Sequence, residues 1–312
     1  MSKKRLFLID AYALIFRAYY AFIKNPIVNS KGFETSAILG FFNSIFDLKR
    51  RENPDYLSVV FDKGGSADRS AIYSEYKSNR NATPDVILDS VPYIYNILNG
   101  LGITTLDLEG YEADDIIGTV AKRAEKKDFE VYMVTPDKDF AQLVTENIFL
   151  YKPARFGNDI EIMGVQEINK KFEIDSPIKV IDYLGMMGDS VDNIPGIPGV
   201  GDKTAKKFLK DYGSIEGLYK NTHNLKGKLK EKVESNQELA MLSKKLATII
   251  TDVPIKYNLE NLKISKPSNE IIISIFEELE FKRLKENYFK LFKQKSDHEI
   301  KEQSTSNAEY KG

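Results

Sequence analysis

The sequence contains no cysteine, and this absence removes several kinds of chemistry. A chain of 312 residues without Cys has no disulfide, no thiolate ligand for a metal and no cysteine nucleophile. Histidine is nearly absent too, because only His223 and His298 are present and neither lies near another reactive cluster. Histidine-based catalytic triads and zinc sites built on histidine are therefore not expected.

Long apolar runs and an excess of one charge are also missing. No stretch approaches the roughly 20 apolar residues that a membrane span needs. The opening run, MSKKRLFLIDAY, is too short in apolar residues for a signal peptide. We therefore expect a cytoplasmic protein that makes no membrane contact. The formal net charge is -1, so binding to nucleic acid would have to come from local clusters of basic residues.

The chain does contain an alternation of short apolar runs with helical patterns. Hydrophobic residues make up 42% of the sequence, which is enough for a buried core. Helix-like stretches at 35–51 and 112–127 lie between runs that have the length and composition of buried parallel strands, namely 5–10, 56–62, 102–107, 129–137 and 147–151. This alternation predicts an α/β fold with a mostly parallel sheet flanked by helices.

The character of the sequence changes near Pro177. Strong strand patterns stop there, and the following segment reads as helices joined by Gly and Pro turns. The last twenty residues are polar and lack an apolar period. We therefore expect an α/β core over 1–176, a helical region over 177–292 and a disordered tail or linker over 293–312.

Acidic residues gather where the predicted strands end. Ligands of an open parallel sheet bind at the carboxyl ends of its strands. Any one of these acids could be a turn or cap residue, and acids at the start of a helix are favoured by its dipole in any case. Together, however, nine carboxylates could meet at one edge of the sheet: Asp10, Asp62, Glu112, Asp114, Asp115, Asp137, Asp139, Asp189 and Asp192.

Such a concentration of negative charge indicates a cation site. Nine carboxylates in one place repel one another unless a cation neutralises them, and hard oxygen ligands suit Mg²⁺ or Mn²⁺. Two metal ions about 4 Å apart polarise a phosphodiester and activate water without a histidine base. The scarcity of histidine fits that chemistry.

A second signal is the stretch ADRSAIYSEYKSNR at 67–80, in which basic and aromatic residues interleave. If the stretch is helical, one face carries Arg69, Tyr73, Tyr76, Lys77 and Arg80. Cations on phosphates and tyrosine rings under bases would suit a nucleic-acid strand. The alternative is a solvated amphipathic helix whose tyrosines pack on the body of the protein. The preceding KGGSAD indicates a mobile attachment beside Asp62.

Glycine and proline precede a lysine-rich segment in IPGIPGVGDKTAKKFLKDYGS, residues 194–214. This pattern is typical of a helix–hairpin–helix element, in which glycines let backbone N–H groups approach a DNA phosphate. A nucleotide-binding loop of the form GxxxxGK[ST] is excluded, because Asp202 separates Gly201 from Lys203 and no strong strand precedes it. Lys203, Lys207 and Lys210 share a face of the helix that follows.

Six motifs, in this order and spacing, resemble the 5′→3′ exonuclease domain of bacterial DNA polymerase I, which belongs to the flap endonuclease superfamily. They are VFDKG, YSEYKSNR, GYEADD, TPDKDFAQLV, GMMGDSVDNIPGIPGVGDKTA and FEELEF. The resemblance covers about residues 5–285. It implies a PIN-like core with a helical arch at about 63–90, followed by a helical region with an H3TH-type DNA-binding motif. It also implies a Mg²⁺-dependent, structure-specific nuclease acting on 5′ flaps and RNA primers.

The resemblance also implies roles for particular residues. The nine carboxylates would hold two metal ions, Lys77 and Arg80 would act in catalysis at the scissile phosphate, and the hairpin loop would coordinate K⁺ through carbonyl groups. The expected substrates are branched or flapped DNA and RNA-primed DNA. Together, the residues and the resemblance predict these DNA contacts: Arg17, Arg69, Tyr73, Tyr76, Gly196, Gly199, Gly201, Lys203, Thr204 and Lys207.

Two departures and two rival functions stay open at this point. Asp68 stands where relatives usually carry an aromatic residue and would weaken the attraction of the arch for phosphate, whereas Ala11 in place of Gly is expected to be harmless. One rival is a small-molecule phosphatase, although LIDAY lacks the second Asp of a DxD motif. The other is a non-catalytic DNA-binding module. The sequence leaves open whether the chain is a stand-alone nuclease or part of a longer polymerase.

Overall fold

The computed structural model describes residues 3–154 and 159–292, so the tail predicted at 293–312 lies outside the described residues. The chain forms two compact units, each built from segments that are distant in the sequence. The first unit combines the residues up to Ala11 with Ser58–Ala82 and Leu106–Leu259, and the second combines Tyr12–Leu57, Thr83–Thr105 and the residues from Glu260 on. The domain boundary predicted at 176 falls inside the first unit and stays a prediction.

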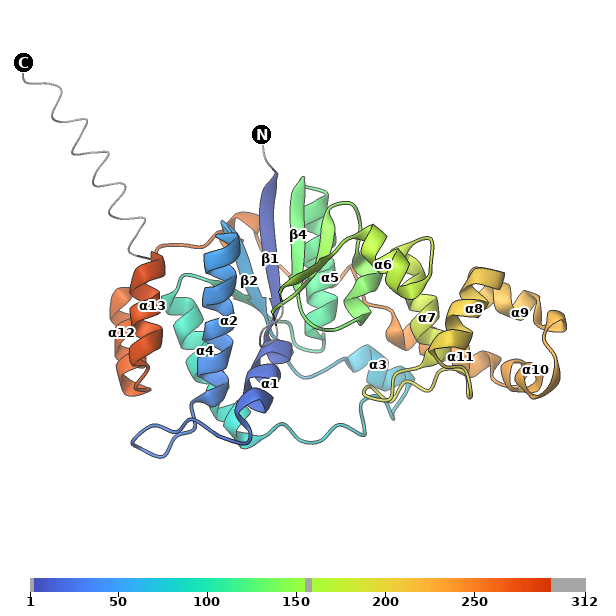
Figure 1. The fold of residues 1–312 in the computed structure, drawn as a ribbon, viewed down its shortest axis with the longest axis horizontal. Coiled ribbons are helices and arrows are strands. Elements are labelled where there is room, and N and C mark those ends of the chain that lie inside the picture. The colour runs from blue at the N-terminus through green and yellow to red at the C-terminus, as the bar shows by residue number, and fades with distance from the viewer. Residues whose placement is uncertain (1–2, 155–158, 293–312) are drawn as a thin grey trace, which may run out of the picture. The chain divides into compact units, whose positions relative to one another are not determined.

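A six-stranded sheet has the order β3-β2-β1-β4-β5-β6 (Figure 1). β1 pairs with β4 and β4 with β5 in parallel, while β5 and β6 are antiparallel. The α/β class and the mostly parallel sheet are therefore confirmed, and all five predicted strands are present. β6 was not predicted, because two of its three residues are exposed and no apolar run marks it. The strands are β1 (Lys4–Asp10), β2 (Tyr56–Val60), β3 (Thr104–Leu106), β4 (Phe129–Val134), β5 (Ile148–Lys152) and β6 (Glu161–Met163).

The register of β1 and β4 places their carboxyl ends side by side. Ile9 of β1 is paired with Val134 of β4, so the residues that follow, Asp10 and Thr135, emerge at the same edge. The inner residues of β1 are fully buried, and the helix α5 (Ala113–Glu125) packs against both strands. Phe7 of β1 stacks on Tyr132 of β4 with ring centroids 4.6 Å apart. The apolar runs of the sequence thus fix the platform from which the strand-end acids project.

The remaining helices of the first unit follow the sheet strands or cluster around α7. α7 packs against α8, α9 and α11. Gly185 of α7 allows the close approach of α11, because a Cβ there would lie 2.8 Å from the Cα of Lys244. The helices are α3 (Ala67–Ile72), α6 (Val165–Phe172), α7 (Val180–Met187), α8 (Asp202–Tyr212), α9 (Ile215–Lys220), α10 (Gly227–Glu234) and α11 (Gln237–Ala247).

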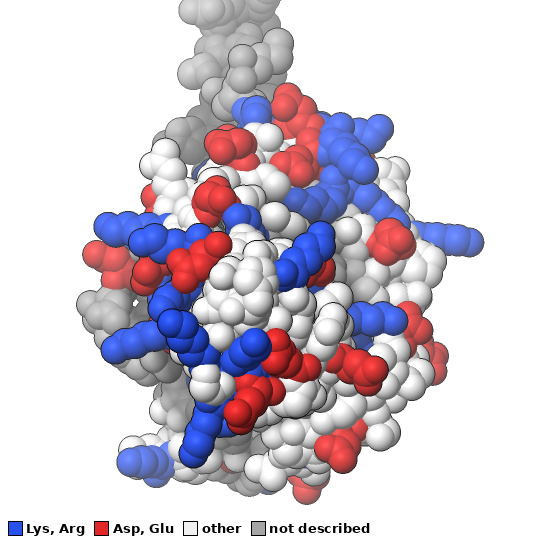
Figure 2. All heavy atoms as spheres, turned by 90° about the vertical axis from the view of Figure 1, so that its right-hand side faces the viewer, with Lys and Arg blue, Asp and Glu red and all other residues white. Residues whose placement is uncertain are grey.

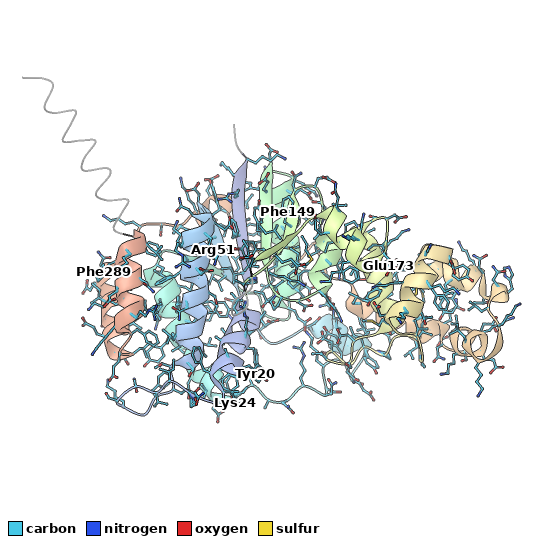
Figure 3. All side chains as sticks on the ribbon, viewed as in Figure 1. Tyr20, Lys24, Arg51, Phe149, Glu173 and Phe289 are labelled. Carbon is cyan, nitrogen blue, oxygen red and sulfur yellow. The ribbon has the colours of Figure 1, made fainter. Side chains whose placement is uncertain are left out.

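The second unit is mainly helical. Helix α4 packs against α2 and α12, and α13 packs against α2 and α12. Tyr20, near the end of α1, is 60% exposed and contacts the rings of Phe16 and Tyr19 (Figure 3). Among the described residues, no helix combines the length and the apolar character needed to cross a membrane. The helices are α1 (Ala11–Phe22), α2 (Ser36–Glu52), α4 (Asp85–Gly100), α12 (Asn269–Glu278) and α13 (Lys282–Phe292).

Candidate metal centre and nucleic-acid interface

The turn after β4 brings three of the predicted acids to one edge of the sheet. The Thr135 hydroxyl donates a hydrogen bond to Asp10 Oδ2 at 3.1 Å and accepts one from the backbone N–H of Asp137 at 3.2 Å. The backbone N–H of Asp139 in turn donates to Asp137 Oδ1 at 2.9 Å. Because these bonds shape the turn, Asp10, Asp137 and Asp139 lie together at the carboxyl ends of β1 and β4.

The first turn of α5 contributes a second group of acids. Asp62, which follows β2, accepts a hydrogen bond from the N–H of Ala113 at 3.0 Å and so ties its loop to the start of the helix. Glu112 precedes that helix, and Asp114 and Asp115 lie in its first turn, with one oxygen of each carboxylate within 4.8 Å of the others. A helix N-terminus favours negative charge. Burial of Glu112 and Asp115 nevertheless requires compensating partners.

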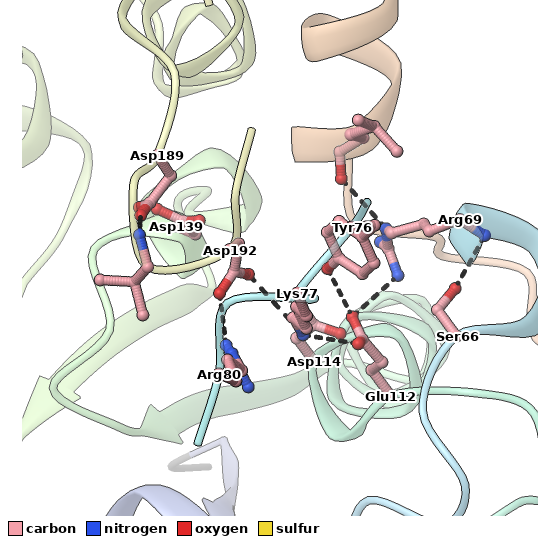
Figure 4. Close-up of polar contacts among 12 residues, drawn as sticks. Ser66, Arg69, Tyr76, Lys77, Arg80, Glu112, Asp114, Asp139, Asp189 and Asp192 are labelled. Atoms are coloured by element: carbon pink, nitrogen blue, oxygen red, sulfur yellow. Dashed lines mark hydrogen bonds and ion pairs between the residues drawn. The ribbon is translucent and has the colours of Figure 1, made fainter. Parts of the chain in front are cut away.

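Those partners come from the arch segment, which we define as residues 63–80. Arg69 binds Asp115 through two hydrogen bonds of 2.7 Å. It also contacts Glu112 at 3.2 Å (Figure 4). The Tyr76 hydroxyl donates to Glu112 Oε2 at 3.0 Å, and the Lys77 ammonium donates to Glu112 Oε1. The carboxylates of Glu112 and Asp115 are therefore paired with the protein's own cations.

The loop after α7 brings the last two predicted acids to the same place. Backbone hydrogen bonds of 2.9 and 2.7 Å join Asp189 and Ile194 and close a tight turn. Asp189 accepts a hydrogen bond from Lys138 Nζ at 3.0 Å, and Asp192 is paired with Arg80 and lies 3.7 Å from Lys77 Nζ. Acids from β1, the β4 turn, α5 and this loop thus belong to one site in the first unit.

Crowding and burial perturb the acids of this site. Burial, with Asp137 as a further cause, raises the pKa of Asp139 to about 8. Burial, followed by the charges of Asp115 and Glu112, raises the pKa of Asp114 well above its usual value. Burial would lower the pKa of Lys77, but the charges of Glu112 and Asp192 more than offset it and the pKa is raised. The site therefore favours bound protons or cations over bare carboxylates.

The arch segment is not the continuous helix that a shared face of its basic and aromatic residues would need. Ser66 caps α3 by accepting from the N–H of Arg69 at 3.2 Å, but the helix ends at Ile72 and Tyr73 is extended. Lys77 then adopts a left-handed conformation with φ of 56° and donates its backbone N–H to the Asp192 carbonyl at 2.9 Å. The five residues predicted to share one helical face therefore do not share one.

Two predicted DNA contacts face inward instead. The exposed fractions of Arg69 and Tyr76 are 4% and 8%, and both side chains contact the acids of α5. The physical reason is that buried carboxylates are costly unless they are paired and hydrogen-bonded. Tyr73 is half-buried, and the Arg80 side chain is 49% exposed. Of the five residues predicted to share that face, Tyr73, Lys77 and Arg80 therefore keep surface to offer to a nucleic acid.

The glycines of the hairpin differ in their burial and in what they contact. Gly196, with φ of 64°, lies back to back with Gly188, so that a Cβ on it would be 2.5 Å from the Gly188 nitrogen. Its N–H donates to Ser243 Oγ at 2.9 Å, which makes Gly196 a packing residue rather than an open phosphate contact. Gly199 and Gly201 are exposed, and Gly201 precedes the first residue of α8.

Lysines surround this part of the hairpin. Lys203, Lys207 and Lys210 are exposed on α8, while Thr204 beside them is half-buried. Figure 2 looks onto the side of the first unit that carries α8–α10 and shows lysine and arginine side chains interspersed with acids. Arg17, also predicted to contact DNA, is half-buried on α1 in the second unit.

Sequence reasoning missed two basic residues. Lys138 is bound to Asp189, and its position between Asp137 and Asp139 in TPDKD was an available signal. Lys232 of α10 lies beside the hairpin, because a Cβ on Gly199 would be 2.9 Å from Lys232 Nζ. No spacing in the sequence indicates that Lys232 lies beside Gly199, because only the packing of α10 brings the two residues together.

Comparison with known proteins gives consistent matches along the chain. Residues 5–173 match the family model of the 5′-3′ exonuclease N-terminal resolvase-like domain, and residues 175–270 match that of the 5′-3′ exonuclease C-terminal SAM fold. The T5 5′-exonuclease with divalent zinc ions bound is similar in fold, with a TM-score of 0.67 at 19% identity over 88% of this chain and 98% of that one.

Two sequence relatives are much closer in identity. A 5′-3′ exonuclease of Aquifex aeolicus is 40% identical over 95% of this chain and 99% of the relative. DNA polymerase I of Bacillus subtilis is 40% identical over 91% of this chain but only 32% of the relative, so the chain spans about a third of that longer protein. On these matches and on the convergence of the strand-end acids, the chain belongs to the 5′-3′ exonuclease family.

Proposed function

We propose that this member of the metal-dependent 5′-3′ exonucleases hydrolyses phosphodiester bonds near the single-strand/duplex junction of 5′-flapped DNA and of RNA-primed DNA, in the cytoplasm. The observation that carries the proposal is Asp139 Oδ1. This carboxylate oxygen is buried and has no hydrogen-bond partner among residues 3–154 and 159–292, in a site whose candidate ligands are all carboxylates. An unpaired buried oxygen among crowded acids fits a hard divalent cation.

Mg²⁺ is the proposed cation, with Mn²⁺ as a substitute. Two such ions, when bound, supply Lewis acidity at the phosphoryl oxygens and lower the pKa of an attacking water. K⁺ is proposed separately at the carbonyls of the hairpin loop. The proposed ligands for the divalent ions are the strand-end, α5 and loop acids, with Asp115 treated separately below: Asp10, Asp62, Glu112, Asp114, Asp137, Asp139, Asp189 and Asp192.

Lys77 and Arg80 are the proposed catalytic cations. Their present partners, Glu112 and Asp192, lie among the proposed metal ligands, so both positive charges are already held at the reacting edge. The bond from the Lys77 N–H to the Asp192 carbonyl, 2.9 Å long, anchors the backbone there. A scissile phosphate that entered the site would accept from these cations, which would offset the charge that develops during in-line attack.

The duplex beside the junction is proposed to rest on the hairpin side of the first unit. Gly199 and Gly201 would present backbone N–H groups, and Lys203, Thr204 and Lys207 would contact phosphates. Lys232 extends this surface, because its ammonium lies next to Gly199. Contacts of this kind recognise backbone shape rather than base sequence, so affinity should fall steeply with salt.

The test uses 5′-labelled flap DNA beside single-stranded DNA, nicked duplex and an RNA-primed duplex, with Mg²⁺ or EDTA. We expect Mg²⁺-dependent release of short products near the junction, and loss of that release in Asp137→Ala. The second candidate is a DNA-binding module without catalysis, which the several exposed lysines on α8 favour. Tight flap binding without cleavage in Mg²⁺ or Mn²⁺ would establish the module and reject the nuclease.

A further inference from the structure

Asp115 is distinguished from the other described acids of the site by a bidentate pair with a single buried guanidinium. It is fully buried. Oδ2 accepts from Arg69 NH1 at 2.7 Å, and Oδ1 accepts from Arg69 NH2 at 2.7 Å and from the backbone N–H of Ile250 at 2.8 Å. A bidentate guanidinium pair of this kind is both strong and geometrically specific.

The guanidinium of Arg69 is engaged by hydrogen bonds at every donor. Besides its two bonds to Asp115, its Nε donates to the Leu246 carbonyl at 3.0 Å, NH2 to the Thr248 carbonyl at 2.8 Å and NH1 to Glu112 Oε2 at 3.2 Å. A guanidinium has five N–H donors, and five bonds are present. No donor of Arg69 is left over for a DNA phosphate.

These bonds join three parts of the first unit. Arg69 belongs to α3 at the start of the arch segment, Asp115 and Glu112 belong to the N-terminus of α5, and the accepting carbonyls flank the end of α11. Moving any one part would leave a buried charge unpaired, which costs several kcal/mol. The pair therefore fixes the start of the arch segment against the acids of the site.

We propose that Arg69 and Asp115 act as a positioning pair: Asp115 does not ligate metal, Arg69 does not contact DNA, and together they hold Glu112 and the arch segment in place. The proposal rests on the metal-site function proposed above. Asp114 provides the contrast within one turn of helix, because it is only half-buried and the hydrogen bond found for its side chain is from the Asp115 N–H at 2.7 Å.

The experiment measures two bindings separately on the full chain: Mn²⁺ alone by calorimetry, and flap DNA alone in EDTA. The variants are Asp115→Asn, Arg69→Lys and the double variant. Because the two residues act as one unit, we expect each single variant to weaken Mn²⁺ binding to a similar degree, about tenfold. The double variant should be no worse than the worse single. Metal-free DNA affinity should stay within about twofold of the parent, and kcat should fall while KM for the flap is unchanged.

Arg123→Lys is the matched control. Arg123 also lies on α5 and donates to backbone carbonyls of the segment after α11, those of Val253 at 2.7 Å and Ile255 at 2.9 Å. Among the described residues, its hydrogen bonds and its ring contact with Tyr257 do not involve the acids of the site. This variant should therefore leave Mn²⁺ binding and kcat unchanged, which separates positioning of the acids from general loosening of α5.

Several results would overturn the proposal. One is the loss of one bound Mn²⁺ in Asp115→Asn but not in Arg69→Lys. Another is weaker metal-free DNA binding in Arg69→Lys alone. Additive losses in the double variant, or no change in Mn²⁺ binding from either residue, would contradict it as well. Thermal unfolding checks each variant. If Asp115→Asn does not fold, Arg69→Lys retains the buried charge and its two bindings decide. If Asp114→Asn and Asp139→Asn also leave Mn²⁺ binding intact, the proposed metal site itself has failed.

Discussion

Two groups of carboxylates in the first unit are neutralised in different ways. The inner group, Glu112 and Asp115, is buried and fully engaged by Arg69, Tyr76 and Lys77. The outer group consists of acids held by more exposed cations or by none, with one buried oxygen of Asp139 unpaired. The members of the outer group are Asp137, Asp139, Asp189 and Asp192.

The difference separates structure-forming charge from charge that awaits a ligand. A buried ion pair that is complete contributes to the placement of its segments, and breaking it leaves an uncompensated charge. A carboxylate that is buried without a full set of partners has its pKa raised instead, as burial does for Asp139, and it gains most from an added cation. Counting acids alone would treat Asp115, whose charge is already paired, as equivalent to the acids that await a cation.

The largest effect should come from breaking the inner group. Arg69→Met would leave Asp115 buried without its partner, so we expect the free energy of unfolding to fall by about 3–5 kcal/mol. Lys138→Met removes the half-exposed cation of Asp189 in the outer group and should cost no more than about 1 kcal/mol. Urea denaturation in EDTA measures both. Equal losses for the two variants would erase the distinction between the groups.

The next effect should come from the outer group and appear in activity. Asp139→Asn removes a proposed ligand, and we expect flap cleavage in Mg²⁺ to slow by about 100- to 1,000-fold, since metal catalysis is worth several kcal/mol and 1.4 kcal/mol is tenfold. Stability in EDTA at neutral pH should not fall, because the raised pKa keeps the Asp139 carboxyl largely protonated there and Asn has nearly the same size. Single-turnover cleavage is the measurement, and exposed Glu146→Gln is the control that should match the parent.

A pH dependence should distinguish the groups as well. The pKa of Asp139 is raised to about 8 in the folded chain, whereas an unfolded Asp has a pKa of about 4. Folding therefore takes up a proton in this window, and metal-free stability should fall as pH rises from about 4 to 8 through this group. Mg²⁺ must displace that proton. The affinity for Mg²⁺ should therefore rise by up to about tenfold per pH unit in this window, and the stabilisation by Mg²⁺ should grow with it.

Thermal unfolding with and without Mg²⁺ at several pH values measures this effect. In Asp139→Asn the contribution of this group to the pH dependence should disappear. A Mg²⁺ effect in the parent that is independent of pH between about 6 and 8 would contradict the assignment of the raised pKa to a ligand.

The smallest effect should be at the hairpin, outside both groups. Lys232→Gln should lower the slope of log affinity against log salt by about one for duplex DNA, because one phosphate contact is lost. Lys230→Gln is the matched control on the same helix, since Lys230 is paired with Glu234 at 3.8 Å. Identical slopes for both variants would remove Lys232 from the proposed surface.

The sequence predicted the secondary structure well where apolar periodicity was strong. The buried runs at 5–10 and 129–137 became β1 and β4, and the acids at their ends met because parallel strands place their carboxyl ends at one edge. β6 was missed because two of its three residues are exposed and so short a segment shows no period. The shared face of the arch residues was conditional on a continuous helix, and that condition is not met because α3 ends at Ile72.

The sequence by itself determined that these acids would lie near one another, because strand ends and a helix start are local features that the sheet then aligns. Only the tertiary structure decided which of them are already neutralised. Arg69 is distant from Asp115 in the chain, and its five hydrogen bonds reach α5 and the end of α11. Whether a charge is paired or left for a ligand depends on burial and on partners brought by the fold, and no residue spacing encodes either.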